Sequence, residues 1–480
     1  MGLRDEFDEA VAAVAEIDFG NSTSPTVNIF ETNIRYLGGL LAAYDLSGRS
    51  VLLQKAVELG DLIYGGFNTE HRMPVDMINF EAAKAGTGLV VENTVVSASP
   101  GTLTLELARL SQITGDPKYY DAITAVVELF YRGQNQTGLP GLFPMFVSML
   151  RGDVTTGDTF TLGGCADSLY EYFPKLHALL SGADPRLPVL TRTFMDAAKR
   201  HLFFQPMVPP SSSASTSSSH NDNNDKISNK RNDILISGTV HLDYQTGEPH
   251  LDPETEHLTC FIGGTFALAG RLLHREEEVR VGARLTRGCV YAYRAFPTGL
   301  MPERFSMVPC GRGTQDDNDG TTGKPCKWDE HKWAEERDKQ LQLQGAESES
   351  ESNNNNRPEQ QQQHLLPKGF TRVPDKRYIL RPEAIESVFY MWRITGDAEW
   401  QDAAWDMFRA VAESTATDLG AAAVVDVTTT AAKPELEDYM ESFWIAETLK
   451  YFYLVFSPPD LISLDKYVLN TEAHPFLRPT

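Results

Sequence analysis

The stretch LARLSQITGDPKYYDAITAVVELF, residues 107–130, predicts two helices joined by a tight turn. Apolar residues recur at helical spacing on both sides of a central ITGD sequence, residues 113–116. In that turn, Gly115 can end the first helix in the left-handed conformation and Asp116 can cap the second helix. The stretch VFYMWRITGDAEWQDAAWDMFRAV, residues 388–411, repeats the pattern around a second ITGD turn.

Related hairpins occur at residues 38–63, 168–201 and, more loosely, 266–293. A single hairpin cannot bury its apolar face, so such repeats must stack or close into a ring. An N-terminal helix counts as half a hairpin, and an apolar helix over residues 438–456, which we expect to be buried, brings the total to about seven units. Residues 466–476 predict a short strand and turn. Because other strand signals are sparse, the predicted fold class is all-α.

Two segments interrupt the hairpins. Residues 209–233 are rich in Ser and Asn, and residues 312–363 are charged, with runs of Asn and Gln. Segments with so few apolar side chains cannot bury enough surface to fold, so we expect both to be disordered surface insertions. The rest of residues 1–480 then forms a single domain.

The composition limits the possible partners. The chain has 43 Lys and Arg residues against 66 Asp and Glu residues, a formal net charge of −23. So acidic a chain is not expected to bind nucleic acid or an anionic membrane surface. It has no apolar run long enough to span a bilayer, and its first residues lack the basic and apolar regions of a signal peptide. The protein is therefore cytosolic, or the start of the chain is missing from this sequence.

The five cysteines, at positions 165, 260, 289, 310 and 326, show no CxxC spacing. A structural zinc site is therefore not expected. The odd number allows one or two disulfides and a free thiol. The segments Asn21-Ser-Thr23 and Asn135-Gln-Thr137 match glycosylation acceptors, a short and frequent pattern.

A pair of carboxylates opens the hairpin at residues 388–411. The preceding sequence, YILRPEAIES (378–387), places Glu383 and Glu386 three apart, with Arg381 just before them. Residues i and i+3 share one face of a helix, so both acids and the arginine can face the same space. Paired carboxylates beside a fixed cation suit acid/base chemistry on an uncharged substrate such as a sugar. The alternative is a solvated helix start, where the helix dipole favours Glu.

Other acids lie inside apolar helix faces, where an unpaired charge is costly. Glu31 and Arg35 are four apart and form either a plain helical salt bridge or part of a site. Asp167 is either a helix cap or a site residue, and a lone histidine such as His257 is more often a core residue than a ligand. In a ring of hairpins the helix starts point to one end, so these acids are expected to meet in one cavity. Further acids at such positions are Glu106, Glu171, Glu256, Glu303, Glu441, Glu447 and Glu472.

Eight segments resemble the class I α-mannosidases, glycoside hydrolase family 47, and follow the order of that family. The resemblance implies an (αα)7 barrel of helical hairpins, with a C-terminal strand and turn that enter the barrel. It also implies that this chain begins after the family's first helix, which would be missing. The segments are VNIFETNIRYLGGLLAAYDLSG (27–48), GTLTLELARLSQITGDPKYY (101–120), GGCADSLYEY (163–172), EHLTCFIGGTFALAG (256–270), TGLMPE (298–303), YILRPEAIESVFYMWRITGD (378–397), DYMESFWIAETLKYFYLVF (438–456) and YVLNTEAHPF (467–476).

The resemblance further implies hydrolysis, with inversion, of terminal α-1,2-linked mannose on the high-mannose N-glycans of glycoproteins. By position, Glu31 matches the general acid, Glu383 the general base and Asp167 a third catalytic carboxylate. One Ca²⁺ is implied, with Thr471 as its ligand through the hydroxyl and main-chain oxygens, and waters held by nearby acids would complete its coordination. The implied water-holding acids are Glu106, Glu171, Glu386, Glu447 and Glu472. The implied substrate-binding residues are Arg35, His257, Arg381, Glu386, Phe443, Glu447 and Glu472, with Phe443 as an aromatic floor.

Several positions differ from the family pattern or leave it open. Either Ser99 stands where the family carries a Glu before the GTL sequence, or the alignment with the family is shifted there. Cys165 occupies a specificity position, where a small or apolar residue goes with the broader Golgi or secreted fungal type and an arginine with the endoplasmic reticulum type. The family's disulfide would join Cys260 to either Cys310 or Cys326.

The leading hypothesis is thus a Ca²⁺-dependent exo-α-1,2-mannosidase. Because the missing helix carries an active-site Asp in the family, one alternative is a mannose-binding or quality-control protein that keeps the pocket without efficient turnover. Another is a glycosidase with the same helical ring that acts on a different sugar. Under the leading hypothesis we expect a monomer, either secreted or in the lumen of the endoplasmic reticulum or Golgi. It would attach to a membrane only through a missing N-terminal anchor.

Overall fold

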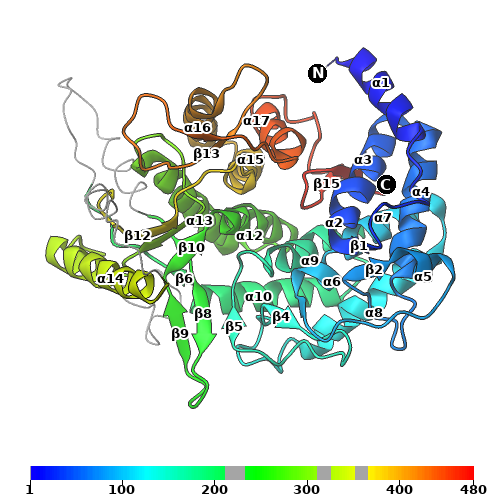
Figure 1. Ribbon diagram of the computed structural model, residues 1–480, viewed down its shortest axis with the longest axis horizontal. Coiled ribbons are helices and arrows are strands. Elements are labelled where there is room, and N and C mark those ends of the chain that lie inside the picture. The colour runs from blue at the N-terminus through cyan, green and yellow to red at the C-terminus, as the bar shows by residue number, and fades with distance from the viewer. Residues whose placement is uncertain (1, 211–232, 311–325, 352–365, 480) are drawn as a thin grey trace.

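Five helical hairpins and two single helices form most of the structure (Figure 1). The computed structural model describes residues 2–210, 233–310, 326–351 and 366–479. Within these residues, α1 (Arg4–Ala15) and α17 (Leu449–Val455) are two of the helices outside the hairpins, and counted with the five hairpins they give about the seven units expected. The hairpins are α3 (Gly38–Ser47) with α4 (Ser50–Gly65), α7 (Thr104–Thr114) with α8 (Pro117–Gly133), α9 (Asp167–Leu179) with α10 (Arg186–His201), α12 (Ile262–Leu272) with α13 (Glu276–Ala295), and α15 (Glu383–Thr395) with α16 (Glu399–Thr415).

The turns of the hairpins form as the sequence predicts. Gly115 follows α7 with a φ of 72° and Gly396 follows α15 with a φ of 67°, so both glycines end their helices in the left-handed region. Gly48 ends α3 in the same way, with a φ of 70°. The carboxylate of Asp116 accepts a hydrogen bond from the N–H of Lys118 at 3.0 Å and caps α8. The turns are therefore set by local backbone chemistry.

The first helix of each hairpin belongs to an inner series. The helices α3, α7, α9, α12, α15 and α17 pack against one another in chain order. Burial agrees with this placement, since every residue of α9 except Asp167 and His177 is buried, whereas α1 has no buried residue and packs against α4. The arrangement confirms the predicted all-α fold, a barrel of helical hairpins.

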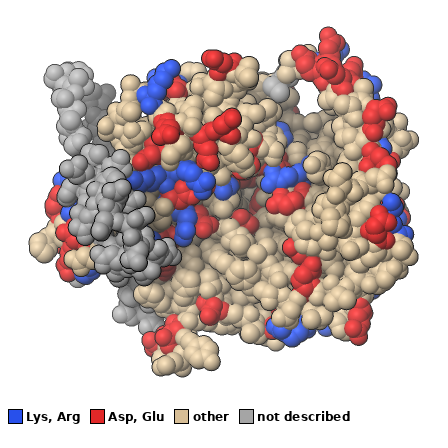
Figure 2. Space-filling model, viewed as in Figure 1, with Lys and Arg blue, Asp and Glu red and all other residues tan. Residues whose placement is uncertain are grey.

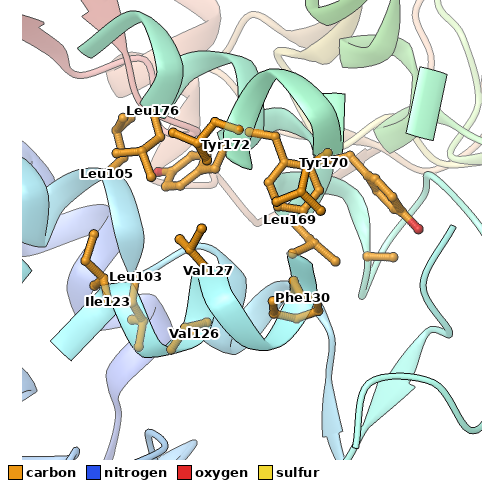
Figure 3. Close-up of a cluster of buried hydrophobic side chains, with 14 of the residues drawn as sticks. Leu103, Leu105, Ile123, Val126, Val127, Phe130, Leu169, Tyr170, Tyr172 and Leu176 are labelled. Carbon is orange, nitrogen blue, oxygen red and sulfur yellow. The ribbon is translucent and has the colours of Figure 1, made fainter. Parts of the chain in front are cut away.

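Apolar side chains of adjacent hairpins interlock to form the core. Figure 3 shows one such contact, where side chains of α8 and α9 and from the start of α7 meet. Within this cluster the rings of Phe130 and Phe143 meet edge to face with centroids 4.9 Å apart. A second buried cluster comes mainly from α12, α13, α15, α16 and α17. The side chains labelled in Figure 3 are Leu103, Leu105, Ile123, Val126, Val127, Phe130, Leu169, Tyr170, Tyr172 and Leu176.

Short strands lie between the hairpins and form sheets of two or three strands. β15 (Tyr467–Leu469) and β16 (Pro475–Leu477) pair antiparallel, and they pack against α9 and α3 respectively. This pair is the predicted C-terminal strand and turn. β10 (Glu254–Glu256), β11 (Arg304–Met307) and β12 (Phe370–Asp375) form a three-stranded sheet in that order.

The remaining strands are β1 (Thr26–Asn28), β2 (Met77–Asn79), β3 (Val95–Val96), β4 (Phe146–Val147), β5 (Thr159–Phe160), β6 (Phe203–Phe204), β7 (Ile236–Ser237), β8 (Thr239–Leu242), β9 (Pro249–Asp252), β13 (Ala423–Val424) and β14 (Leu436–Glu437). The remaining helical segments are α2 (Ile29–Glu31), η1 (Thr32–Leu37), α5 (Phe80–Lys84), α6 (Ala98–Gly101), η2 (His257–Phe261), α14 (Glu330–Glu351) and η5 (Trp444–Thr448).

The last helix is shorter and more exposed than the sequence predicts. The π-helical segment η5 begins at Trp444 and continues into α17, and residues 438–442 before it are not helical. The expectation of a fully buried helix is wrong, since Ile445 is 65% exposed. The described helices that pack on this element are α15 and α16, and they cover only part of its apolar surface. Neither α17 nor any other helix among the described residues is long and apolar enough to cross a membrane.

Part of the second predicted insertion is helical. Residues 330–351 form α14, which the expectation of disorder missed. Trp333 on this helix is buried against Met207 and Val308, and its indole N–H donates to the carbonyl of Phe370 at 3.0 Å. Trp333 thus anchors α14, although the average composition of this segment predicts disorder. Residues 211–232, 311–325 and 352–365 of the two predicted insertions lie outside the described residues.

Two disulfides form, and the predicted pairing of Cys260 is wrong. Cys260 on η2 bonds to Cys289 on α13, with Cα atoms 6.1 Å apart, because α13 packs directly against η2. Cys310 and Cys326 bond to each other instead. Cys165 is free and exposed, so the count of two disulfides and one thiol agrees with the range expected from sequence.

Candidate active site

Irregular backbone marks the segments that carry the predicted site residues. The segments η1 and η5, which precede α3 and α17, are π-helical, a rare form that is frequent at functional sites. Three non-glycine residues with positive φ lie beside site residues, namely Cys165 (79°), Leu380 (70°) and Ala473 (56°). Such residues are strained and persist only where their surroundings hold them in place. Apart from His257, the predicted site residues lie on or next to these segments.

Glu383, the first residue of α15, contacts a guanidinium and an imidazole. Its Oε2 lies 3.0 Å from Nδ1 of His257 and its Oε1 lies 3.5 Å from Nη1 of Arg381. His257 is fully buried, and its Nε2 lies 2.9 Å from the hydroxyl of Tyr293. Burial works to raise the pKa of Glu383, but Arg381 and the hydrogen bond from His257 outweigh burial and lower the pKa below its ordinary value. Glu383 is therefore an oriented, ionised carboxylate.

Asp167, the first residue of α9, has a different environment. Its Oδ1 accepts a hydrogen bond from the N–H of Ser168 at 2.8 Å. Burial is the main reason that the pKa of Asp167 rises to about 7, and the negative charges of nearby acids add to this effect. These acids are Glu171, Glu383 and Glu256. The pKa values of Asp167 and Glu383 are thus pushed in opposite directions, as in sites that divide acid and base roles.

Glu31 and Arg35 lie on consecutive turns, and Arg35 links this pair to the interior. Oε2 of Glu31 lies 2.7 Å from Nε of Arg35. The Nη1 of Arg35 lies 3.1 Å from Oε1 of Glu472 and donates to the hydroxyl of Ser442 at 2.9 Å. The side chain of Glu31 is 48% exposed, against 13% for that of Glu383. Glu31 is therefore the more accessible of these two acids.

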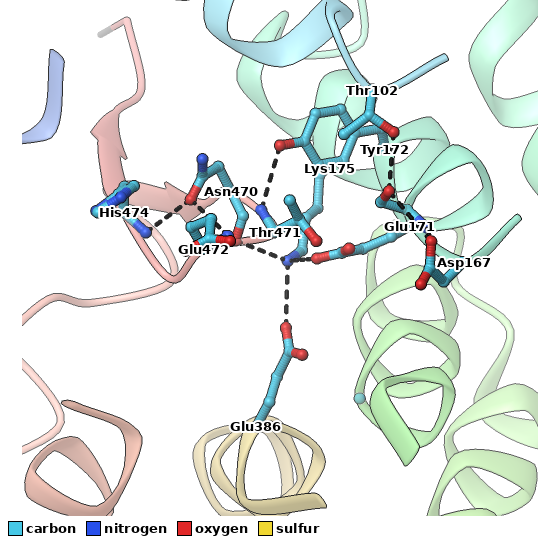
Figure 4. A network of polar contacts seen from close by, with 12 residues as sticks. Thr102, Asp167, Glu171, Tyr172, Lys175, Glu386, Asn470, Thr471, Glu472 and His474 are labelled. Atoms are coloured by element: carbon cyan, nitrogen blue, oxygen red, sulfur yellow. Dashed lines mark hydrogen bonds and ion pairs between the residues drawn. The ribbon is translucent and has the colours of Figure 1, made fainter. Parts of the chain in front are cut away.

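A buried lysine joins acids of α9 and α15 (Figure 4). Nζ of Lys175 pairs with Glu171 and lies 3.3 Å from Oε1 of Glu386. Glu386 also accepts a hydrogen bond from the hydroxyl of Tyr451 at 3.0 Å. The side chain of Lys175 is only 1% exposed, and removal of one member of a buried ionic cluster leaves an uncompensated charge. These side chains therefore act as one unit.

Two further acids are buried together on η5 and in the C-terminal turn. Burial, followed by the charge of Glu472, raises the pKa of Glu447 well above its ordinary value. Burial also raises the pKa of Glu472, although Arg35 opposes the change. Lys450 on α17 donates to the carbonyl of Ala473 at 2.9 Å beside them. Such acids need either a proton or a bound cation to be neutral.

The turn between β15 and β16 carries Thr471 and is held from several sides. The fully buried side chain of Asn470 donates to the carbonyl of Ile34 at 3.1 Å and to Oε1 of Glu106 at 2.8 Å. Its oxygen accepts hydrogen bonds from two N–H groups of the turn itself. The N–H of Thr471 donates to the hydroxyl of Tyr172 at 3.2 Å. Side chains or backbone from η1, α7 and α9 thus fix the position of this turn.

The surroundings of Thr471 fit a hard cation that has one direct protein ligand. Within the described residues, the N–H of Thr471 donates to Tyr172. The hydroxyl and carbonyl oxygens of Thr471 are therefore available to bind a cation. No group of three or more His, Cys, Asp or Glu side chains in that part of the chain is placed to hold a metal ion directly. Buried carboxylates that lack full charge compensation nevertheless lie close by. A cation here would therefore bind Thr471 directly and the acids through water, a donor set that suits Ca²⁺.

Phe443 supplies an apolar surface at this charged site. Its ring centroid lies 5.7 Å from Cζ of Arg381, and the residue is 8% exposed. Arg381 is fixed in turn by Glu303, whose Oε2 lies 2.5 Å from its Nε. The guanidinium thus touches both the aromatic ring and Glu383.

Seven of the predicted site residues form two chains of contacts. Glu31, Arg35 and Glu472 make one chain of contacts, and Phe443, Arg381, Glu383 and His257 make another. The charges of Glu472 and Glu383 both raise the pKa of Glu447, so Glu447 lies near both chains. Figure 2 shows acidic and basic side chains side by side across the hollowed middle of one face.

Sequence reasoning missed two members of the site, Lys175 and Asn470. Both are buried polar residues whose partners are distant in sequence. For Lys175 the available signal is its position four residues after Glu171 in an apolar helix. For Asn470 it is only the adjacency to Thr471.

The chain is similar to known proteins over nearly its whole length. The chain matches the profile of glycosyl hydrolase family 47 over residues 1–478. It is 29% identical, over 99% of its length, to mannosyl-oligosaccharide 1,2-alpha-mannosidase IB of Mus musculus and covers 60% of that relative. It is 30% identical to a mannosyl-oligosaccharide alpha-1,2-mannosidase of Coccidioides posadasii. That alignment covers 99% of this chain and 80% of that relative. The chain therefore spans about 60% of the length of the mammalian relative.

The fold also resembles a solved structure. The alpha-1,2-mannosidase from Trichoderma reesei superposes with a TM-score of 0.76 at 28% identity, and the match covers 99% of this chain and 87% of the other. The agreement extends over nearly the whole chain and is not limited to single hairpins.

Proposed function

The chain belongs to glycosyl hydrolase family 47, and on that basis we propose that it is an inverting, Ca²⁺-dependent exo-α-1,2-mannosidase that trims terminal mannose from high-mannose N-glycans. The observation that carries this proposal is the environment of Glu383. A carboxylate kept ionised by Arg381 and oriented by His257 is the general base that an inverting hydrolase needs. The activities of the relatives support the same substrate class.

The base would act on a water beside the sugar. Oε2 of Glu383 is engaged by His257, whereas the contact of Oε1 with a described residue is the longer one to Arg381, so Oε1 is the oxygen that would accept the proton of the water. The water then attacks the anomeric carbon from the face opposite to the leaving group, which inverts the configuration. Arg381 and Phe443 would hold the terminal mannose in place.

Glu31 would protonate the glycosidic oxygen as the bond to the leaving sugar breaks. Its exposed side chain can reach a substrate at the surface, directly or through one water. Asp167, with its pKa raised to about 7, would hold or move a further proton near the reacting centre. Hydrolysis then consumes one water and releases mannose and a shortened glycan.

Thr471 would hold the Ca²⁺ through its hydroxyl and carbonyl oxygens, with waters fixed by buried acids around it. When bound, the ion would bind and orient sugar hydroxyls and neutralise nearby carboxylates. Asn470 and Tyr172 keep Thr471 in position for this role.

We place the protein in the secretory lumen or outside the cell. Two disulfides are typical of proteins that fold in an oxidising compartment, and N-glycans are found there. The relatives include an endoplasmic reticulum enzyme of Homo sapiens, which supports this location.

One observation favours a second candidate, a mannose-binding protein without efficient turnover. Ser99 replaces an acid of the family pattern, and its hydroxyl donates to Oδ1 of Asp76 at 2.5 Å. Relative to the family pattern, the substitution removes one carboxylate from α6, which precedes α7.

One assay separates the two candidates. We expect release of mannose from an α-1,2-linked oligomannose, with loss of activity on addition of a chelator and recovery with Ca²⁺. Binding of the glycan without any release would favour the second candidate. Release that is insensitive to chelator would contradict the role of Ca²⁺.

A further inference from the structure

Glu256 holds the loop that leads into Asp167. Its Oε2 accepts a hydrogen bond from the N–H of Gly164 at 2.8 Å. A Cβ at Gly163 would lie 2.5 Å from the same oxygen, so the carboxylate approaches this backbone as closely as glycine permits. Cys165, the next residue, is held in the left-handed region with a φ of 79°. A strained loop of this kind needs an outside contact to keep its shape.

The loop transmits its position directly to Asp167. The carbonyl of Gly163 accepts hydrogen bonds from the N–H groups of Ala166 at 3.2 Å and Asp167 at 3.0 Å. A shift of the Gly163-Gly164 segment would therefore move the start of α9 and the carboxyl group on it.

The residue after Glu256 holds the other carboxylate. Nδ1 of His257 lies 3.0 Å from Oε2 of Glu383, and the N–H of His257 donates to the carbonyl of Glu303 at 2.8 Å. Two consecutive residues at the end of β10 thus contact the starts of α9 and α15, which are far apart in sequence.

We propose that Glu256 is a positioning residue which, together with His257, fixes the separation and orientation of Asp167 and Glu383. This inference rests on the proposed function, since it assigns Glu256 to the same reaction. Glu256 makes its contact with the loop, and its effect on the reaction passes through Asp167. The dipeptide Glu256-His257 would then keep the carboxyl groups of Asp167 and Glu383 at a constant separation and orientation.

The charge of Glu256 gives a second effect that can be measured. The charged and titratable groups that face Asp167 are Glu171 on its own helix, paired with Lys175, Glu383 on α15, paired with Arg381, and Glu256 on β10. Cys165 in the preceding loop is a further titratable neighbour. A negative neighbour makes the ionisation of Asp167 harder, so removal of the Glu256 charge should lower the pKa of Asp167.

Three variants of Glu256 test the proposal. Glu256→Gln keeps an oxygen that can accept from Gly164 and removes the charge. We expect near-normal kcat, with the limb of the pH profile of kcat/KM near pH 7 moved to lower pH by roughly half a unit or more. Glu256→Ala and the shorter Glu256→Asp lose the contact with Gly164. We expect kcat to fall by about 10–100-fold in both, with little change in KM, because the reacting groups are misplaced.

Glu254→Gln is the matched control, since it makes the same change on the same strand at a residue paired with Arg304 and Arg372. It should leave the pH profile unchanged. Wild-type kcat in Glu256→Asp, or a Glu256→Gln profile that superposes on the wild type, would overturn the inference. If Glu256→Ala does not fold, the Gln and Asp variants still decide the outcome. A wild-type protein that releases no mannose would instead contradict the proposed function, so the two failures can be told apart.

Discussion

The hairpins α7–α8 and α15–α16 share almost the same sequence pattern and the same turn, yet they differ at the end opposite the turn. At the turn, both contain ITGD, and both glycines adopt the left-handed conformation with φ values of 72° and 67°. A Cβ at either glycine would meet no atom within 4 Å, so the turns are equivalent in their surroundings as well. These ends of the hairpins serve the fold alone.

At the opposite end, each hairpin presents a buried acid to a different environment. Glu106 on α7 has neutral partners, with Tyr172 donating at 2.7 Å and Asn470 and Asn33 each donating at 2.8 Å. Burial therefore dominates and raises the pKa of Glu106 to about 7. Glu383 on α15 meets Arg381 and His257, and its pKa is lowered. The comparison teaches that repetition builds the barrel, while chemistry resides where the repeats differ.

The largest effect is expected where the two acids differ most. Glu383→Gln should reduce kcat by about 10²–10⁴-fold, because the amide cannot accept a proton from water. Glycan binding should remain measurable, since the shape of the side chain is kept. Steady-state kinetics and direct titration of an oligomannose would show this separation. Simultaneous loss of folding and binding would mean that Glu383 is structural and that the comparison fails.

The acid of the other hairpin should control stability through pH. The ordinary pKa of Glu is 4.5, and Glu106 titrates at about 7 in the folded protein. Between these values the folded state binds more protons than the unfolded state, so the free energy of unfolding falls as pH rises. The decrease in the free energy of unfolding that is attributable to Glu106 should reach about 3 kcal/mol above pH 7 and vanish below pH 4.5.

The variant Glu106→Gln isolates this contribution. Unfolding by denaturant should be measured from pH 4 to 8 for both proteins, with chelator present so that metal binding does not interfere. The difference between the two curves should change with pH over the predicted window, whatever constant offset the new amide adds. A difference that is constant with pH would show that Glu106 is ionised in the folded state, like Glu383.

The neighbours of Glu106 should also support the ion site. Tyr172 contacts Glu106 and Thr471, so the α7 acid stands behind the proposed Ca²⁺ ligand. Thr471→Ala should lose the stabilisation that Ca²⁺ gives the wild type, about 2.7 kcal/mol at a Ca²⁺ concentration of 100 times Kd. Melting curves with and without Ca²⁺ measure it. An equal shift in both proteins would place the ion elsewhere.

The sequence predicted what local chemistry determines. Helical periodicity and the ITGD turns act over a few residues, and the hairpins formed where the pattern indicated. Contacts between residues far apart in the sequence could not be predicted in the same way. Lys175 meets Glu386 across 211 residues, and Cys260 bonds to Cys289 because two helices pack together. The resemblance named the site residues, and their roles remain predictions that the variants above can test.

The smallest effect should appear at the equivalent ends of the two hairpins. Gly115→Ala and Gly396→Ala each place a Cβ on a left-handed residue, which should cost about 1–2 kcal/mol of the free energy of unfolding. Because no atom beyond the local backbone lies within 4 Å of either Cβ, the cost comes from the local clash between the Cβ and the backbone alone and should be the same at both sites to about 0.5 kcal/mol. Denaturant unfolding of both variants and of the double variant measures the two costs and their additivity.

Neither variant should change kcat, since both turns lie at the end of the hairpin away from the acids. A clear difference between the two sites would mean that the tertiary context of each hairpin reaches its turn, so that the repeated and the unique ends are not independent.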